Sequence, residues 1–423
     1  MAKKKSEENH CSFCGRSESE VGALLHGLNA MLCDRCVVDA YNLLEREGML
    51  PADAQKASKR GKKIALSSVP KPKELKAYLD QYVIGQEEAK KYLCVAVYNH
   101  YKRLAAEAEG TNKSGEDEIE IDKSNIILVG PTGTGKTFLA RTIAKRLDVP
   151  FCIVDATVFT EAGYVGEDVE SILTRLLQAA DYDLARAEQG IVFIDEIDKI
   201  ARKADNPSIT RDVSGEGVQQ SLLKLLEGTV VNVPPKGGRK HPDQDYIHVD
   251  TRNILFICGG AFDGIEKKIA QRLNTHTVGY DNVRRTKKID PKNLMQYVEP
   301  TDLKSFGLIP EIIGRLPVLT HLEPLDRDAL KRILTQTKNS LVRQYEALFR
   351  MDGVQLTFTD DALDYIVDKA VALKLGARGL RSIVESIMNN AMFEIPGSKQ
   401  KTFEVTREYA VEQYEQNFPE RLA

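Results

Sequence analysis

The residues best suited to chemistry form the glycine-rich segment GPTGTGKT at 130–137. An apolar run at 126–129 precedes it, and apolar residues at helical spacing follow it. Glycines permit backbone conformations in which successive N–H groups point at phosphate oxygens, and the start of a helix adds positive potential. Lys136 would place a cation beside the β- and γ-phosphates, and Thr137 would offer a hydroxyl to Mg²⁺. The pattern predicts a nucleoside-triphosphate site; the alternative is an ordinary glycine-rich turn.

A second apolar run, at 191–194, ends in the acidic pair Asp195 and Glu196. In a chain that alternates strands and helices, such a strand end lies beside the phosphate loop, at the carboxyl edge of a parallel sheet. Asp195 would hold Mg²⁺ through water, and Glu196 would polarise the water that attacks the γ-phosphate. The alternative is a solvated acidic strand end without a catalytic role.

Four of the seven cysteines form two CxxC pairs, Cys11 with Cys14 and Cys33 with Cys36. Four thiolates at this spacing can surround one Zn²⁺ and leave no position for water, which predicts a structural metal site. The alternative is two redox or disulfide pairs. The many apolar residues of this segment favour dimerisation or contact with another protein. The remaining cysteines lie in apolar stretches and are expected in the core: Cys94, Cys152 and Cys258.

Charge and composition exclude several classes of protein. With 59 Lys+Arg and 62 Asp+Glu the formal charge is −3, so there is no overall basic field for nucleic acid. No apolar run reaches the roughly 18 residues of a membrane span, and the N-terminus does not read as a secretory signal. We therefore expect a cytoplasmic protein that binds neither nucleic acid nor membrane. Neither a nucleophile elbow nor an HExxH motif occurs, so any peptidase would have to be a separate partner.

The elements that must position these residues are apolar strands alternating with amphipathic helices. Strands are expected at 126–129, 151–154, 191–194 and 254–258, in a parallel sheet wrapped by helices with the ligand at the strands' carboxyl ends. Residues 265–299 form a long polar stretch. Helices are expected at 326–349 and 360–375; residues 376–381 are expected to interrupt the helical pattern, and a further helix then runs to about residue 393. The expected parts are a zinc-binding domain (1–50), a flexible linker (51–70), a large α/β ATPase domain (71–320) and a small C-terminal domain (321–423).

With these motifs the chain resembles the ClpX family of AAA+ ATPases, the unfolding subunits of ClpXP proteases. The resemblance runs essentially end to end. It rests on the four-cysteine segment and on the motifs YVIGQ (82–86), GPTGTGKT (130–137), GYVG (163–166), IVFIDEIDKI (191–200), RKH (239–241), GRLP (314–317) and GARGLR (376–381). HslU-type unfoldases look similar in the ATPase part but lack such a zinc domain and carry an inserted domain.

The resemblance implies an AAA+ P-loop NTPase fold and a homohexameric ring that hydrolyses ATP between subunits. The ring would unfold tagged or unfolded proteins and feed them to a ClpP-type peptidase. Its zinc domain would dimerise and receive adaptors or substrates. The residues implied to contact ATP are Val83, Ile84, Gly130, Pro131, Thr132, Gly133, Thr134, Gly135, Lys136, Thr137 and Phe138. On spacing alone, Val83 and Ile84 could equally be a hydrophobic staple at a helix start.

Further roles follow from the same resemblance. Arg315 would reach the neighbouring subunit's γ-phosphate as an arginine finger, and Arg378 would be the sensor of the small domain. With Lys136, Asp195 and Glu196 they complete the implied catalytic set. The segment 202–215 would be a second pore loop. The residues implied to contact the polypeptide in the axial pore or at its entrance are Tyr164, Val165, Arg239, Lys240 and His241.

Two features depart from the family pattern. The loop that docks onto ClpP usually carries Ile-Gly-Phe, and its counterpart here is Val278-Gly279-Tyr280, which keeps the aliphatic–glycine–aromatic order but adds a hydroxyl. Second, the polar strand-end sensor common in AAA+ proteins is not evident near Cys258 and Gly259, and no residue is assigned to it.

Two other functions compete with the unfoldase. A nucleic-acid motor would use the zinc segment and the basic residues on DNA, but the apolar pair Tyr164-Val165 and the near-neutral charge argue against it. A nucleotide-switched holdase with slow turnover would not need the full set of catalytic residues given above.

Overall fold

The computed structural model describes residues 9–27, 30–46, 69–109, 121–160, 167–202, 215–234, 246–275, 293–374, 376–398 and 400–417. The chain divides into two compact units, residues 1–62 and 63–423. In the first unit, a hairpin of β1 (Leu24–His26) and β2 (Met31–Cys33) leads into α1 (Asp34–Arg46). Within these described ranges, no helix is both long enough and apolar enough to cross a membrane.

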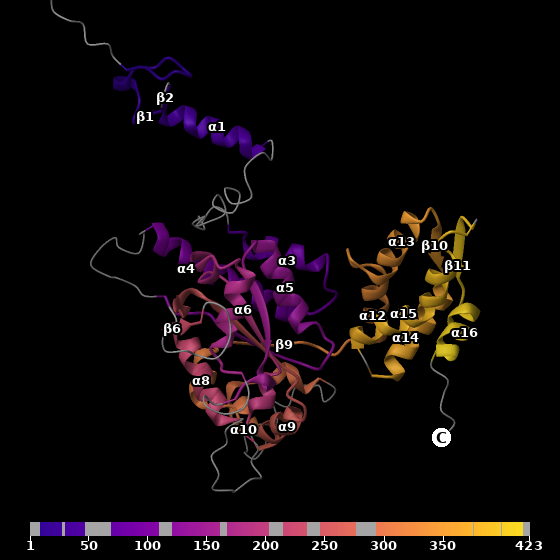
Figure 1. Cartoon of the computed structure of the whole chain (residues 1–423). Coiled ribbons are helices and arrows are strands. Elements are labelled where there is room, and N and C mark those ends of the chain that lie inside the picture. Colours follow the sequence, from indigo (N-terminus) through magenta and orange to yellow (C-terminus); the bar gives the residue numbers. More distant parts are fainter. Residues whose placement is uncertain are drawn as a thin grey trace, which may run out of the picture. The chain divides into compact units, whose positions relative to one another are not determined.

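A five-stranded parallel sheet lies at the centre of the second unit (Figure 1). Its strands are β3 (Ile126–Val129), β4 (Phe151–Asp155), β5 (Ile191–Asp195), β8 (Leu255–Gly260) and β9 (Val318–His321), in the order β4-β5-β8-β3-β9. Both faces are covered: in β3, Ile127 and Val129 belong to one core, and Ile126 and Leu128 belong to the other. A parallel sheet buried on both faces has continuous apolar strands, which is why four of the five could be predicted.

Helices cover the two faces of this sheet in two groups. The face of Ile126 and Leu128 packs against α3 (Pro72–Asp80), α4 (Glu87–Glu109) and α5 (Lys136–Leu147). The opposite face is covered by α6 (Ser171–Ala179), α7 (Leu184–Ala187), α8 (Glu216–Glu227), α9 (Ile265–Thr275), α10 (Pro300–Phe306) and α11 (Pro310–Arg315). An antiparallel hairpin, β6 (Val230–Val233) and β7 (Ile247–Asp250), follows α8. The predicted α/β fold with a parallel sheet is confirmed. Cys94, Cys152 and Cys258 are buried as expected.

Residues 325–417 form a smaller helical part around their own core (Figure 1). Its elements are α12 (Arg327–Thr335), α13 (Leu341–Met351), β10 (Gln355–Phe358), α14 (Asp360–Ala372), α15 (Gly376–Glu394), β11 (Thr402–Val405) and α16 (Arg407–Asn417). The single helix expected at 326–349 is wrong, because α12 ends at Thr335 and α13 begins anew at Leu341. The Ser340 hydroxyl caps α13 by accepting a hydrogen bond from the Arg343 N–H (3.4 Å).

Among the elements of the larger part that the sequence did not predict are α9 and β9. The stretch 265–299 is polar, yet it contains α9. The buried side chains of this helix are those of Ile265 and Ile269, too few to give a clear helical pattern in the sequence. Strand β9 crosses the expected domain boundary at 320, and three of its four residues are only partly buried. Both elements take their stability from packing that their own sequences barely indicate.

A buried amide joins several of these elements, and its removal is expected to be costly. The Asn125 side chain donates to the carbonyls of Arg315 (3.0 Å) and Leu226 (3.5 Å) and accepts from the Phe256 N–H (3.2 Å). Asn125→Ala should lower the free energy of unfolding by about 2–4 kcal/mol, since buried main-chain groups lose their partners. Urea unfolding followed by circular dichroism would measure this. Asn99→Ala, on the exposed side of α4, should change stability by less than about 0.5 kcal/mol, and equal effects would contradict the prediction.

Candidate functional site

The phosphate loop runs from the carboxyl end of β3 into the first turn of α5. Gly133 and Gly135 have φ of +82° and +101°, conformations that a β-carbon disfavours. At Gly130 the constraint is space, since a β-carbon there would lie 2.8 Å from the Leu322 carbonyl oxygen. The glycines of the motif are therefore required by backbone geometry and by the close approach of the segment that follows β9.

Lys136 lies inside this loop. Its ammonium donates to the carbonyls of Gly130 (2.5 Å) and Pro131 (3.0 Å), and the residue is 8 % exposed. Burial lowers the pKa of Lys136, and the nearby carboxylates of Asp195 and Asp198 oppose this shift. A buried cation that, among the described residues, donates its hydrogen bonds to main-chain carbonyls is well placed to exchange them for phosphate oxygens.

The acidic strand end lies beside the loop, as the sequence predicts. The Thr137 hydroxyl donates to the Asp195 carboxylate (2.9 Å), so the two groups that were predicted to hold Mg²⁺ are in direct contact. Oxygen ligands of this kind, one carboxylate and one hydroxyl, suit Mg²⁺, which keeps most of its waters. Glu196 follows as an exposed residue with φ of +57° and ψ of +35°, and its N–H donates to Asp195 (3.0 Å).

The start of α15 approaches the same loop from a distant part of the sequence. A β-carbon on Gly376 would lie 3.4 Å from the Gly133 α-carbon and 3.4 Å from the Thr132 carbonyl oxygen. Besides burial, the charge of Arg378 helps to lower the pKa of Lys136. The structure thus brings Arg378 and the N-terminus of α15 near the phosphate loop, where both add positive potential.

Arg315 lies elsewhere. Its carbonyl is bound by Asn125, which precedes β3, whereas the phosphate loop follows β3. The Arg315 main chain and the phosphate loop therefore lie at opposite ends of β3. Four residues at about 3.3 Å per residue make this distance about 13 Å. The Arg315 side chain is exposed and pairs with Glu227 at the end of α8 (3.2 Å).

The expected adenine-contacting segment is held by two side chains that sequence reasoning missed. Val83 and Ile84 are nearly buried, and the ammonium of Lys90 donates to the Val83 carbonyl (2.8 Å). The Gln86 amide makes two 2.8 Å hydrogen bonds to the main chain of Glu323, just after β9. Neither residue type signals this role in the sequence, because both contacts are tertiary.

The four predicted zinc ligands converge in the first unit. The Sγ atoms of Cys11, Cys14, Cys33 and Cys36 all lie within 4.8 Å of one another. Tetrahedral zinc with Zn–S bonds of about 2.3 Å places its sulfurs about 3.8 Å apart, so the cluster fits the metal. Hydrogen bonds from main-chain N–H groups, that of Cys14 foremost, lower the pKa of Cys11 to about 6, which favours a thiolate. A hydrogen bond with Cys14 and burial raise the pKa of Cys36.

Known proteins match the chain along its whole length. Residues 9–46 match the ClpX C4-type zinc finger, residues 121–319 the AAA domain (Cdc48 subfamily), and residues 325–406 the C-terminal D2-small domain of ClpB protein. The chain is 67 % identical over 415 residues to the ATP-dependent Clp protease ATP-binding subunit ClpX of Bacteroides fragilis, covering 98 % of each. The same-named protein of Bacteroides thetaiotaomicron is 65 % identical over 425 residues, covering 100 % of this chain and 99 % of that protein.

The chain belongs to the ClpX family. A further relative, the ClpX subunit of Porphyromonas gingivalis, is 63 % identical over 410 residues and 97 % of each chain. The resemblance drawn from the motifs is therefore confirmed, and so is the combination of AAA domain, small domain and four-cysteine zinc finger.

Several residues implied by the ClpX pattern lie outside the described ranges. These are Tyr164, Val165, Arg239, Lys240, His241, Val278, Gly279 and Tyr280, with most of the second expected pore segment. The two ends of the GYVG segment are nevertheless joined: the Thr160 N–H donates to the Glu167 carbonyl, and the Glu167 N–H to the Val158 carbonyl, both at 3.2 Å. The residues that flank the segment, Thr160 and Glu167, therefore lie side by side.

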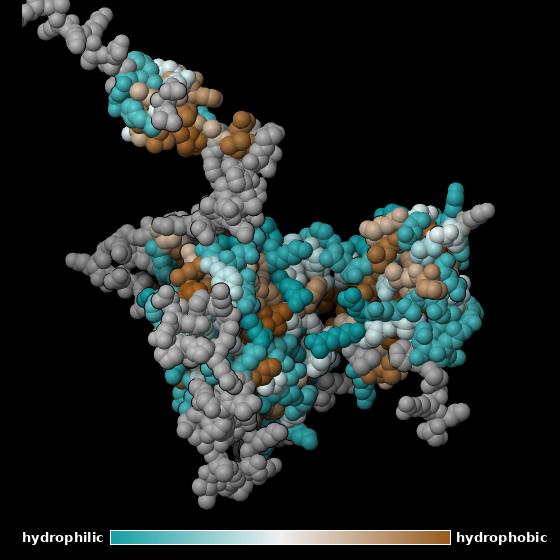
Figure 2. All heavy atoms as spheres, viewed as in Figure 1, coloured by the Kyte–Doolittle hydropathy of each residue, from teal (hydrophilic) through white to brown (hydrophobic). Residues whose placement is uncertain are grey.

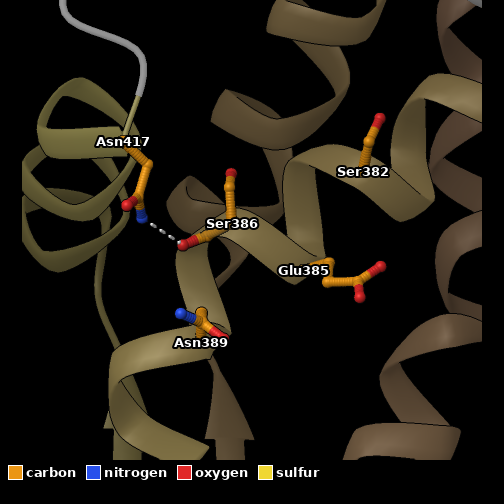
Figure 3. A pocket seen from close by; sticks show the side chains of 5 residues that line it. All are labelled: Ser382, Glu385, Ser386, Asn389 and Asn417. Carbon is orange, nitrogen blue, oxygen red and sulfur yellow. Dashed lines mark hydrogen bonds between the residues drawn. The ribbon is translucent and has the colours of Figure 1, made fainter.

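Two hollows lie apart from the phosphate loop. One is a shallow polar depression between α15 and α16, lined by Ser382, Glu385, Ser386, Asn389 and Asn417 (Figure 3). It offers one carboxylate and no cation, so it does not suit a nucleotide phosphate. The other adjoins the base of the GYVG segment and is lined by Thr160, Asp168, Val169, Glu170, Ser221, Lys224, Leu225, Thr229, Val230, Val231, Asn232 and Tyr246.

Proposed function

We propose that this ClpX-family ATPase works as a hexameric ring that unfolds proteins and threads them to a separate ClpP-type peptidase. The observation that carries the proposal is the separation of Arg315 from the phosphate loop by the length of β3. Phosphoryl transfer needs cations around the γ-phosphate in addition to those of the loop. If Arg315 is one of them, it must act on a neighbouring subunit's nucleotide, which makes the ring the catalytic unit.

Within one subunit, the described residues suit the steps of hydrolysis. The loop N–H groups and Lys136 would bind the phosphates, and Arg378 would add charge from the small domain. Thr137 and Asp195 would hold Mg²⁺, which, when bound, neutralises phosphate charge. Glu196 would accept a proton from the attacking water as the water oxygen bonds to the γ-phosphorus and the bond from that phosphorus to the β–γ bridging oxygen breaks, releasing ADP and phosphate.

The roles in binding the polypeptide are proposed from membership of the ClpX family, in which the corresponding segments are expected to line the axis of the ring. Tyr164 and Val165 would grip substrate through an apolar tip, which tolerates many sequences. Arg239, Lys240 and His241 would attract acidic termini at the pore entrance. The segment 278–280 would dock onto the peptidase.

Replacing the gripping tyrosine should separate ATP use from unfolding. Tyr164→Ala is expected to hydrolyse ATP within about threefold of the parent yet unfold substrate at least about tenfold more slowly, because only the transmission of force is lost. The measurement is ATP-dependent loss of native fluorescence from a stably folded, terminally tagged protein. Tyr182→Ala, which changes an exposed tyrosine outside the GYVG segment, is the matched control. Parental unfolding by Tyr164→Ala would contradict the proposal, and ATPase stimulation by duplex DNA with steep salt dependence would favour a nucleic-acid motor.

The zinc-binding unit is proposed to pair with another copy or with an adaptor. Apolar side chains gather on its surface around α1 (Figure 2), among them Leu25, Val38 and Leu43, each more than half exposed. Val38→Glu should weaken self-association of residues 1–62 about tenfold or more, because it buries a charge in the contact. Sedimentation of the zinc-loaded unit measures this. Unchanged association with unchanged zinc content would move the contact elsewhere.

A further inference from the structure

One peptide group connects the phosphate loop to the turn that carries Glu196. It is the peptide between Gly260 and Ala261, at the end of β8. Its carbonyl oxygen accepts a hydrogen bond from the N–H of Gly130, the first residue of the phosphate loop (3.1 Å). Its N–H donates to the carboxylate of Asp198 (3.1 Å). Strand β8 ends in two glycines and offers no polar side chain here, so its main chain makes the connection instead.

Asp198 is built into this contact. Its side chain is 2 % exposed, in the 3-10 turn Ile197–Ile200 that follows Glu196. A β-carbon on Gly260 would lie 2.7 Å from Asp198 Oδ1, so the carboxylate approaches the main chain as closely as only glycine allows. The other carboxylate oxygen lies 3.3 Å from the ammonium of Lys199. A carboxylate buried this deeply needs compensation. Here the hydrogen bond from the Ala261 N–H supplies it, and the ion pair with the half-exposed Lys199 adds little because solvent screens it.

Glu196 needs such a support. Its left-handed backbone conformation is unfavourable for a residue with a side chain, and it persists only where neighbouring structure fixes it. The Lys199 N–H donates to the Glu196 carbonyl (2.9 Å), so Glu196 and Asp198 belong to one closed turn. Fixing Asp198 against β8 therefore fixes the place at which the Glu196 side chain leaves the sheet.

We propose that Asp198 is a positioning residue for Glu196. Through the peptide of Gly260 and Ala261, it sets the distance between the carboxylate that activates water and the loop that holds the γ-phosphate. The inference rests on the proposed role of Glu196. Small displacements of a catalytic group can reduce turnover strongly without affecting substrate binding.

The experiment compares three variants of the full chain in ATP turnover and in binding of a fluorescent ATP analogue. Asp198→Ala removes the acceptor and should lower kcat at least about tenfold, with the Kd within about threefold. Asp198→Asn keeps the shape and an oxygen acceptor, and its kcat should stay within about threefold of the parent. Lys199→Ala removes the exposed ion-pair partner and should leave kcat within about twofold.

Three results would overturn the inference. The first is parental kcat in Asp198→Ala. The second is an Asp198→Asn variant as impaired as Asp198→Ala, which would assign the effect to charge. The third is a joint loss of nucleotide affinity and thermal stability, which would assign Asp198 a general structural role.

A second perturbation reaches the same contact from β8. Gly260→Ala would place a β-carbon 2.6 Å from the Phe262 ring and 2.7 Å from Asp198 Oδ1. If its thermal stability shows that the packing of Phe262 is kept, the displaced carboxylate should lower kcat more than nucleotide affinity, and this variant serves as the test if Asp198→Ala does not fold. A folded Gly260→Ala variant with parental kcat would overturn the inference. Glu196→Gln, assayed in parallel, separates the two proposals. If Glu196→Gln still hydrolyses ATP, the role of Glu196 is refuted. If Glu196→Gln loses turnover while Asp198→Ala keeps the parental turnover, only the role of Asp198 is refuted.

Discussion

Glu196→Gln is expected to lower ATP turnover by about 10²–10⁴-fold while leaving ATP binding nearly unchanged. Glutamine has the shape of glutamate but cannot accept a proton from the attacking water. The phosphates would be bound by the loop and by Lys136, and neither is altered. The main-chain N–H of residue 196, which contacts Asp195 at 3.0 Å, is retained as well. Single-turnover hydrolysis and equilibrium binding of a fluorescent ATP analogue would measure the two effects separately.

A matched glutamate provides the control for this prediction. Glu385→Gln changes an exposed carboxylate in the depression between α15 and α16, away from the phosphate loop, and should hydrolyse ATP like the parent. Brisk hydrolysis by Glu196→Gln would remove Glu196 from the mechanism. Equal losses in both variants would mean that the exchange acts through the protein's charge or assembly.

The part of the site that could be predicted from the sequence is the part whose groups are consecutive. The phosphate loop needs only residues 130–137, and Asp195 ends an apolar run, so both motifs are visible without a fold. Their contact, Thr137 with Asp195 at 2.9 Å, follows from a general rule: parallel strands bring their carboxyl ends to one edge. The zinc site was predictable for a similar reason, since CxxC spacing is local.

The supporting residues could not be found in this way. In the sequence, nothing distinguishes Asp198 from the other acidic residues of its motif. Its role becomes visible only in the structure, where the Ala261 N–H donates to its carboxylate. Gln86 gains its role from the main chain of Glu323, far away in sequence, and Lys90 from the carbonyl of Val83. Arg378 could be connected with the nucleotide only through the family resemblance, because its approach to Lys136 depends on how the helical part folds back.

Loss of a zinc ligand is expected to have a similarly large effect on the zinc-binding unit, because the metal rather than a hydrophobic core stabilises its fold. Among its described residues, the buried cluster consists of Cys11, Cys33 and Cys36, with Val21 and Leu24 packed against it. So small a cluster cannot offset the loss of chain entropy, so most of the folding energy must come from zinc, about 10–16 kcal/mol for such sites. Cys33→Ser should therefore lose the metal and unfold this unit. ATP turnover should remain within about twofold, since residues 63–423 have separate cores.

Zinc content by mass spectrometry and hydrogen exchange of peptides from 9–46 would test this unfolding. Cys94→Ala is the matched control: it removes a buried thiol from α4, outside the four-cysteine cluster, and should leave zinc content unchanged. If Cys33→Ser kept its zinc, the ligand set would be wrong. If it lost zinc yet kept slow exchange in this segment, the polypeptide would hold the fold by itself. If it lost ATP turnover as well, the two units would depend on each other energetically, in contrast to their separate cores.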